Sequence, residues 1–308
     1  MLTYERLSKK PLLFKSFTGL TVHEFDNIYN KKIIKKYHKH EIQRLSKRKD
    51  TKRERKAGDV GRPFKLDVKN RFLMLLVYYR LYITYTLAGF LFDLDQSNVC
   101  RDIQKIDSLV RQCVPIPQKL YNITKRLKTP EEIEKYFPGL MAFIDCTEQQ
   151  IPRPIDKDRR KMYYSGKKKR HTVKNQLMVN NRGHILHKAN HHKKGRKHDY
   201  DVYKKNHPVT PKQVVNVVDL GYLGVEKDYP EQLSALPYKK KRNYELSQEE
   251  KEYNKIHSKK RIVVEHTICR LKKYRIMSDI FRNKLRKYNR ISDIVAGLVN
   301  YRIMNQGL

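Results

Sequence analysis

Apolar positions recur at helical spacing through the first third of the chain. Residues 1–43 show this spacing, and Thr21 followed three residues later by Glu24 predicts a capping box at the start of a helix. A second, strongly apolar helix is predicted from Leu66 to Leu81. The N-terminal part of the chain is therefore expected to be all-α.

Two short helices with a shared core are predicted from Thr84 to Ile106, with a break near Leu94–Asp95. The small side chain of Ala88 would let the helices cross closely, and Asp95 would cap the second helix. The core is expected to contain Leu87, Leu91, Leu94, Val99 and Ile103. This pattern is typical of a helix-turn-helix, with a plain helical hairpin as the alternative. The exposed first turns of the second helix would present Gln96, Ser97, Asn98 and Arg101 to DNA.

The pattern changes to that of strands at Leu140. Three successive strands with short turns between them predict an antiparallel meander over residues 140–151, 170–181 and 183–192. A helix is expected at residues 198–206, with Asp199 as its candidate cap. The apolar run at residues 214–220 is typical of a strand buried on both faces. Helices at Ser258–Tyr274 and Ile291–Met304 complete an α/β arrangement with a mixed sheet.

These elements suggest three parts. We expect an N-terminal helical segment with a basic linker at residues 1–60, a helix-turn-helix DNA-binding domain at 61–138 and an α/β domain at 139–308. A length of 308 residues is enough for more than one domain with a core of its own.

The formal net charge of +37 adds information about function, because an excess of this size predicts an anionic binding partner. Double-stranded DNA is the leading candidate. A membrane surface fits less well, since the basic residues are spread over the chain instead of one amphipathic helix. No apolar run approaches the ~18 residues of a membrane span, no secretory signal is visible, and the 4 cysteines form no CxxC pair. We expect a cytoplasmic, nucleoid-associated protein.

Two runs of basic residues are candidates for contacts with the DNA backbone. From Arg44 to Lys56 there are eight basic residues against Asp50 and Glu54, and a solvated linker and a phosphate-binding arm remain equal alternatives. The turn after the first strand carries Lys167, Lys168, Lys169, Arg170 and Lys174. We expect these five side chains to contact DNA phosphates, with a solvated hairpin as the alternative.

Three acids could form a metal site. Asp145 and Asp219 each follow a hydrophobic strand, where an unpaired carboxylate is costly. Glu265 lies on a helix with Arg261 and Lys272, four and seven residues away. At about 100° per residue, all three side chains share one narrow face. Carboxylates from two strands and a helix suit Mg²⁺, and two ions would serve phosphoryl transfer. Turn caps at the two Asp residues and an ordinary Arg261–Glu265 surface pair are the alternatives.

Several of these stretches together resemble the DDE transposases of bacterial insertion sequences, and more closely the branch shared with Harbinger-type nucleases. They are IDCTE (144–148), YYSGKKKRHTVKNQ (163–176), HD (198–199), VVDLGYLG (217–224) and RIVVEHTICRLK (261–272). The resemblance covers residues 140–305 strongly and the N-terminal segments more loosely. It implies an RNase H-like catalytic domain in which Asp145, Asp219 and Glu265 hold Mg²⁺, or Mn²⁺ in its place.

The resemblance also implies a reaction. Transposon ends would be nicked by activated water, and the freed 3′-hydroxyl would attack target DNA. Two ends must be handled together, so a homodimer or larger assembly on DNA is expected. Many relatives carry a Tyr three residues before the Arg, where this chain has Ser258. The His-Asp pair corresponds to His198 and Asp199, which we interpret as a helix cap.

Other chemistries fit the sequence less well. A zinc site could be imagined from the histidines at His184, His187, His191, His192 and His198, but no familiar ligand spacing completes it. We expect these side chains to face phosphate or to be exposed. Tyrosine recombination would need one Tyr served by an Arg/His cluster, and 21 tyrosines make chance matches easy. A non-catalytic, sequence-specific DNA-binding protein is the alternative function. It would keep the helix-turn-helix but need no acid triad. The terminal repeat and target sequences are not encoded in any of these motifs.

Overall fold

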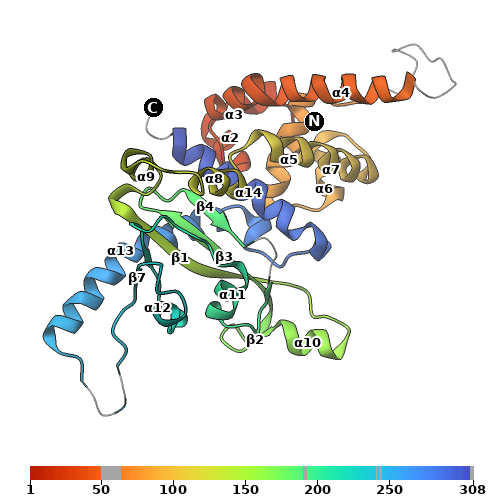
Figure 1. The fold of residues 1–308 in the computed structure, drawn as a ribbon. Coiled ribbons are helices and arrows are strands. Elements are labelled where there is room, and N and C mark those ends of the chain that lie inside the picture. The colour runs from red at the N-terminus through yellow and green to blue at the C-terminus, as the bar shows by residue number, and fades with distance from the viewer. Residues whose placement is uncertain (50–63, 190–192, 241, 243–244, 306–308) are drawn as a thin grey trace. The chain divides into compact units, whose positions relative to one another are not determined.

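The computed structural model describes residues 1–49, 64–189, 193–240, 242 and 245–305. The chain divides into two compact units. Unit 1 comprises Met1–Val114 and the short segment Tyr274–Ile276, and unit 2 comprises Pro115–Lys273 and Met277–Leu308. Residues 115–138, which the sequence pattern grouped with the helix-turn-helix, make their contacts within unit 2. Figure 1 shows the strands of the second unit and the helices of both.

The described part of unit 1 is helical. Its elements are α1 (Tyr4–Ser8), α2 (Pro11–Thr18), α3 (Val22–Ile28), a π-helical turn (Tyr29–Ile33), α4 (Ile34–Lys49), α5 (Val68–Leu81), α6 (Tyr85–Phe92) and α7 (Gln96–Cys113). The capping box predicted at Thr21 is confirmed: the Glu24 N–H donates to Thr21 Oγ1 at 3.1 Å, and the Thr21 N–H donates to Glu24 Oε2 at 2.7 Å. The first part of the basic run, through Lys49, continues α4, and residues 50–56 lie outside the described residues.

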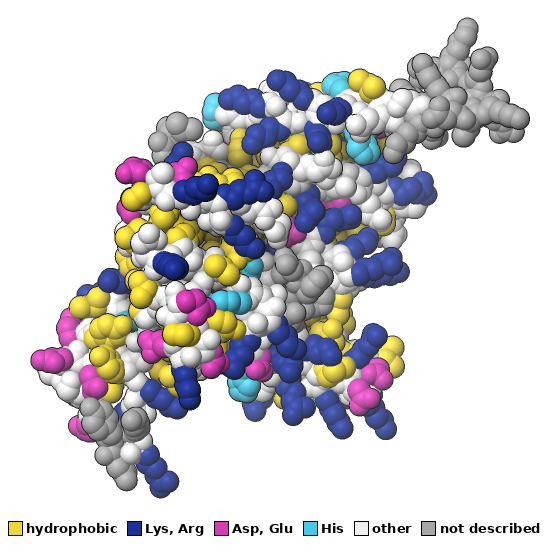
Figure 2. All heavy atoms as spheres, in the orientation of Figure 1, with side chains coloured by type: hydrophobic (Ala, Val, Ile, Leu, Met, Phe, Trp, Pro, Cys, Tyr) yellow, Lys and Arg dark blue, Asp and Glu magenta, His cyan; other side chains and the backbone are white. Residues whose placement is uncertain are grey.

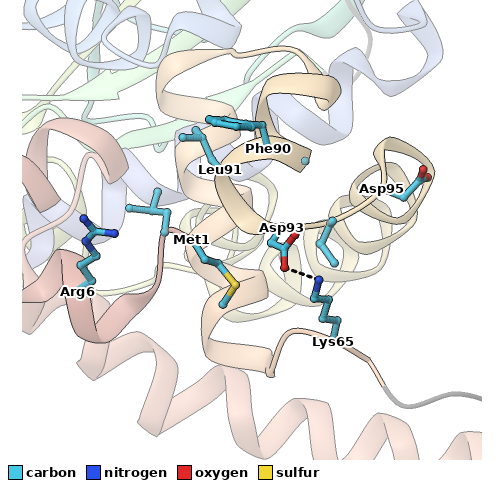
Figure 3. Close-up of a pocket in the computed structure, with 10 residues that line it drawn as sticks. Met1, Arg6, Lys65, Phe90, Leu91, Asp93 and Asp95 are labelled. Carbon is cyan, nitrogen blue, oxygen red and sulfur yellow. Dashed lines mark hydrogen bonds and ion pairs between the residues drawn. The ribbon is translucent and has the colours of Figure 1, made fainter.

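Helices α6 and α7 form the expected hairpin. Asp95 caps α7 by accepting the N–H of Ser97 at 2.8 Å. Between the helices, Asp93 adopts a left-handed conformation with φ of 53°. Its carboxylate pairs with Lys65 at 2.5 Å, as Figure 3 shows. At Gly89 of α6 an added Cβ would lie 2.5 Å from the carbonyl oxygen of Leu94 in the turn and 3.7 Å from the backbone nitrogen of Gln96, the first residue of α7. Glycine therefore leaves the room that the turn needs to fold back against α6.

One residue expected in the hairpin core lies on its surface. Ala88 and Phe92 are fully buried and lie one helical turn apart, so they define the inner face of α6. Leu87 is rotated by about 100° from that face and is 45% exposed, so its assignment to the core was wrong. Val99 and Ile103 are buried as expected. The four side chains predicted to face DNA are all exposed: Gln96, Ser97, Asn98 and Arg101.

A buried ion pair joins α5 to α7. Arg71 is 1% exposed, and its Nη2 lies 3.1 Å from Asp102 Oδ1. Burial raises the pKa of Asp102, while the charge of Arg71 opposes that rise. Each charge is therefore tolerated in the core only because the other is present.

Unit 2 is built around a mixed sheet. Its strands are β1 (Met141–Gln150), β2 (Tyr164–Ser165), β3 (Arg170–Asn180), β4 (Ile185–Lys188), β5 (Lys193–Lys194), β6 (Val215–Val217) and β7 (Ser234–Ala235). The order along the sheet is β2-β3-β1-β6-β7, with β4 and β5 also paired to β3. Strands β1, β3 and β4 pair antiparallel, which confirms the meander. Strands β6 and β7 run parallel to β1.

Helices lie against this sheet. They are α8 (Pro117–Thr124), α9 (Pro130–Tyr136), α10 (Lys157–Tyr163), α11 (Asp199–Asn206), α12 (Val225–Asp228), α13 (Gln248–Lys272) and α14 (Tyr288–Asn305), with a short 3₁₀ turn, η3, at Leu220–Tyr222. One apolar cluster joins Ala142 and Ile144 of β1 to Tyr203 of α11 and Tyr222 of η3. Val264 and Leu271 of α13 are buried, which orients that helix.

Helix α13 is longer than its apolar pattern suggested. It begins at Gln248, ten residues before Ser258, because Ser247 and Glu250 form a capping box there. Helix α11 also begins differently: His198 is the residue before the first turn, makes no side-chain cap, and Asp199 is the first helical residue. The interpretation of Asp199 as a cap was therefore wrong.

The buried pair in unit 1 gives a prediction for stability. Asp102→Ala leaves the Arg71 guanidinium buried without its charge partner, so we expect a loss of about 3–5 kcal/mol in the free energy of unfolding. The double variant Arg71→Met with Asp102→Leu removes both charges, and we expect it to recover most of that loss. Urea unfolding followed by circular dichroism measures both. A double variant as unstable as Asp102→Ala would contradict this account.

Candidate functional site

Asp145 and Asp219 lie together because their strands are neighbours. In the parallel pairing of β1 with β6, Phe143 lies opposite Val217. Each Asp follows two residues later, so both carboxylates reach the same edge of the sheet. Asp145 Oδ1 accepts the N–H of Cys146 at 2.7 Å, and Asp219 Oδ1 accepts the N–H of Gly221 at 2.9 Å. The two predicted acids thus form a pair of partly exposed side chains.

Arg261 of α13 bridges the two acids. Its Nη2 lies 3.2 Å from Asp145 Oδ2 and 3.9 Å from Asp219 Oδ2. The Arg261 side chain is largely buried, since Val264, three residues on, is directed into the core. The sequence predicted that this helix would bring Glu265 to the two acids and that Arg261 would hold a phosphate; in the DNA-free structure the Arg261 guanidinium supplies positive charge between Asp145 and Asp219.

The pKa of Asp145 is shifted by this arrangement. Burial raises the pKa of Asp145 to about 6; the charge of Arg261 opposes the rise, and the carboxylate of Asp219 adds to it. Without the guanidinium the pKa would be higher still. Positive charge beside Asp145 therefore stabilises the ionised form of a carboxyl that burial would otherwise keep protonated.

The third predicted acid is not brought to this pair. Glu265 lies on α13 one turn beyond Arg261, about 6 Å along the helix axis, and its side chain is exposed. Among the residues that the structure describes, no group of three or more His, Cys, Asp and Glu side chains is arranged to hold a metal ion. Lys272 is half-buried, and burial lowers its pKa, with a smaller contribution from the charge of Lys168.

The residues present fit a hard divalent cation in part. Asp145 and Asp219 offer carboxylate oxygens, which Mg²⁺ prefers, and the position between them already attracts the charge of Arg261. Two carboxylates with water and phosphate oxygens suffice to hold Mg²⁺. The chemistry of the donor set thus agrees with the sequence prediction for the two Asp residues.

A second charged cluster lies beside the first. Lys174 Nζ is 2.8 Å from Asp199 Oδ1 and 3.5 Å from Glu148 Oε1, and it donates to the backbone oxygen of Lys197 at 2.8 Å. Lys174 is 7% exposed. Its predicted contact with the DNA backbone is therefore wrong, because the side chain enters the protein. Only the pairing of β1 with β3, in which Glu148 lies opposite Lys174, could have signalled this.

The other basic side chains predicted to contact DNA are on the surface. Lys167, Lys168 and Lys169 are exposed in the turn before β3, and Arg170, the first residue of β3, is exposed beside them. Around the same corner of unit 2 a hollow is lined by Arg153, Arg160, Lys161 and Arg196. Figure 2 shows Lys and Arg side chains gathered over the α10–β2 region. This corner carries strong positive potential.

The histidines that are close together in the sequence lie in different environments in the structure. His187 is buried against the ring of Tyr121, with centroids 4.5 Å apart, and burial lowers its pKa to about 4. The expectation that His187 would be exposed or face phosphate was wrong. His198 is exposed, and His191 and His192 lie outside the described residues.

Comparisons with known proteins agree with this geometry. Residues 144–300 match the model of the DDE superfamily endonuclease, and residues 64–116 match the helix-turn-helix of DDE superfamily endonuclease. A curated relative from Microchaete diplosiphon, described as a probable transposase for insertion sequence element IS702, is 33% identical over 253 residues, which are 81% of this chain and 86% of the relative. No solved structure matches the chain. No helix in the described ranges is long and apolar enough to cross a membrane.

The raised pKa of Asp145 gives a pH prediction. The native carboxyl binds its proton more tightly than the unfolded one, so wild-type stability falls as pH rises from about 4 to 6. The side chain of Asp145→Asn does not titrate, so this loss of stability with rising pH is absent from the variant. In EDTA we expect it to gain up to about 3 kcal/mol over wild type between pH 4 and pH 7. Thermal unfolding across this range measures the gain. Asp158→Asn, an exposed acid on α10, is the control, and an equal gain there would contradict the assignment.

The exposed end of α7 gives a second prediction. Arg101 Nη1 donates to Asn98 Oδ1 at 3.1 Å, which fixes the guanidinium near the first turns of the helix. Arg101→Ala is expected to weaken binding to the element's own ends by about 1–3 kcal/mol. Arg111→Ala removes the same charge at the other end of α7 and should weaken binding much less. Fluorescence anisotropy with labelled duplexes makes the comparison, and equal losses would refute a specific role for the first turns.

Proposed function

This chain belongs to the DDE superfamily of endonucleases and is a DNA transposase, and we propose that Asp145 and Asp219 carry its strand-cleaving chemistry. The observation that supports this most directly is the placement of the two carboxylates side by side on neighbouring parallel strands, with Arg261 between them. A domain that only bound DNA would have no use for a second acid beside the largely buried carboxylate of Asp145. The non-catalytic alternative is therefore less well supported.

We propose that Asp145 and Asp219 hold Mg²⁺, with Mn²⁺ as a substitute, and that Glu265 is the third carboxylate. Bound divalent ions, two in the proposed mechanism, would supply charge stabilisation in phosphoryl transfer and a more acidic water. Support for Glu265 comes from its place on α13, one turn from Arg261, and from the family match that includes it.

In this proposal the basic side chains of the catalytic unit bind different phosphates. Arg261 presents a planar fork of donors at the acid pair, which suits a phosphate as well as a carboxylate. Lys272 lies on the same face of α13 and would hold a neighbouring phosphate. The exposed cations Lys167, Lys168, Lys169 and Arg170 would follow the DNA backbone.

Sequence recognition is assigned to α7. In the helix-turn-helix, Gln96, Ser97, Asn98 and Arg101 are proposed to reach base edges in the major groove. The corresponding domains would be residues 1–60, 61–138 and 139–308, the last with an RNase H-like architecture. Its support is the meander of β1, β3 and β4 followed by β6 and β7 parallel to β1.

We propose that water first attacks a phosphodiester at each transposon end, and that the released 3′-hydroxyl then attacks target DNA. In the first step water forms a P–O bond as the P–O3′ bond breaks, leaving a 3′-hydroxyl and a 5′-phosphate; in the second the 3′-hydroxyl forms a new phosphodiester as a P–O3′ bond of the target breaks. Neither step needs a covalent bond to the protein. Two ends require two sites, and a homodimer or larger assembly on DNA is proposed for that reason. A protein so basic that acts on DNA would be found with the nucleoid.

Nicking of supercoiled plasmid that carries the element's own ends tests the proposal. With Mg²⁺, Asp145→Asn, Asp219→Asn and Glu265→Gln are each expected to lower the nicking rate by at least about 10³-fold, because each removes charge from the reacting site. Binding to the ends in EDTA should be retained.

Two variants serve as matched controls. Asp158→Asn on α10 and Glu252→Gln on α13 remove exposed acids and should cut at the wild-type rate. The catalytic assignment of a residue is refuted where its variant cuts as fast as its control. Equal rates for the Glu265 and Glu252 variants would leave the Asp pair and remove Glu265 from it.

A further inference from the structure

Lys174 is an unusual residue in a protein with so many surface lysines. It lies on β3 in the interior of unit 2, with three partners around one ammonium: Asp199, Glu148 and the backbone oxygen of Lys197. A buried ammonium is costly, and it persists where nearby acids need its charge. The pKa of Lys174 is lowered by burial but raised overall, chiefly by the hydrogen bond to Asp199.

The acid that Lys174 holds lies next to the catalytic pair. An added Cβ on Gly221 would lie 2.9 Å from Asp219 Oδ1 and 3.5 Å from Asp199 Oδ2. Gly221 therefore lies between the two carboxylates, and its own N–H donates to Asp219 Oδ1. Lys174 pairs with Asp199, whose carboxylate lies beside the Gly221 turn, and the Gly221 N–H in turn donates to Asp219 Oδ1. Asp199 also interacts electrostatically with Asp145.

This arrangement places one more acid near the pair than a two-carboxylate centre needs. With Lys174 present, the cluster of Lys174, Asp199 and Glu148 carries one net negative charge instead of two, and the closer partner, Asp199, is held beside the Gly221 turn. Without Lys174, its carboxylate would be unneutralised beside Asp219, free to repel that residue or to compete for a cation. The lysine thus determines how much negative charge the site presents and where it lies.

We propose that Lys174 is a positioning residue of the catalytic site: its buried ammonium neutralises Asp199 and holds it at Gly221, so that Asp219 keeps the orientation needed for strand cleavage. The proposal rests on the proposed role of Asp219. Lys174 touches no reacting atom in this scheme and acts through Asp199 and the Gly221 turn.

The test compares Lys174→Met, the double variant Lys174→Met with Asp199→Asn, and Lys174→Arg. Binding of Mn²⁺ to the DNA-free protein is measured from the electron paramagnetic resonance signal of free Mn²⁺, and nicking is measured at saturating Mn²⁺. Lys174→Met is expected to bind Mn²⁺ several-fold to about tenfold more tightly, because one positive charge is lost near the acids. Its nicking rate should nevertheless fall by at least about tenfold, because Asp219 is displaced.

The other variants separate this role from a structural one. Removing the Asp199 charge as well should return Mn²⁺ affinity and nicking toward wild type, and Lys174→Arg should keep both. Lys188→Met is the matched control: Lys188 is also a buried lysine of the sheet, but its Nζ pairs with Asp293 of α14 at 3.1 Å. We expect that variant to lose stability without a change in Mn²⁺ affinity.

Opposite results overturn the inference. Weaker Mn²⁺ binding by Lys174→Met, with no recovery in the double variant, would make Lys174 a structural residue only. The same change in Mn²⁺ affinity in Lys188→Met would also refute it. Nicking by Asp219→Asn at the wild-type rate would instead refute the proposed function, and the role of Lys174 with it. Circular dichroism confirms that each variant is folded before it is compared.

Discussion

Two acids side by side on adjacent parallel strands are the constraint on which the site of unit 2 depends. The pairing of β1 with β6 brings Asp145, in the middle of β1, next to Asp219, just after β6. Burial makes the ionisation of Asp145 costly without positive charge nearby. Helix α13 supplies that charge through Arg261, and Val264 and Leu271 fix the helix against the sheet. The apolar packing of the helix therefore determines the electrostatics of the site.

Buried ion pairs recur through this very basic chain, and they explain how its charge is divided. Arg71 pairs with Asp102, Lys174 with Asp199 and Lys188 with Asp293, each largely out of water. Such pairs contribute little net stability, but each specifies which elements meet. Because these acids are paired in the interior, they do not offset the exposed lysines and arginines. The surface thus keeps the positive potential that attracts DNA.

Local sequence patterns predicted the helices and strands well. They did not predict which residues far apart in the chain would contact one another. The Thr21 capping box, the α6–α7 hairpin and the meander follow from residues a few positions apart. The adjacency of Asp145 and Asp219 could be anticipated because both follow apolar strand residues, although Asp145 lies within β1 and the expectation that it ends its strand was wrong. The burial of Lys174 could not be anticipated, since it depends both on the register of β1 with β3 and on the position of Asp199 in α11. Likewise, Glu265 shares the helix face of Arg261 but is exposed, because a few tens of degrees of rotation separate the edge of that face from its centre.

The cost that the acid pair imposes on folding has a consequence for how copies of such a gene persist. Under the proposed function, a copy in which Asp145 has been replaced by a neutral residue would lose its chemistry but gain the predicted conformational stability, so protein quality control would not remove it. Its unit 1 would be unchanged and would keep its proposed recognition of the same DNA. Inactive descendants would then occupy the ends that an active copy needs, and an expanding family of elements would restrain its own spread.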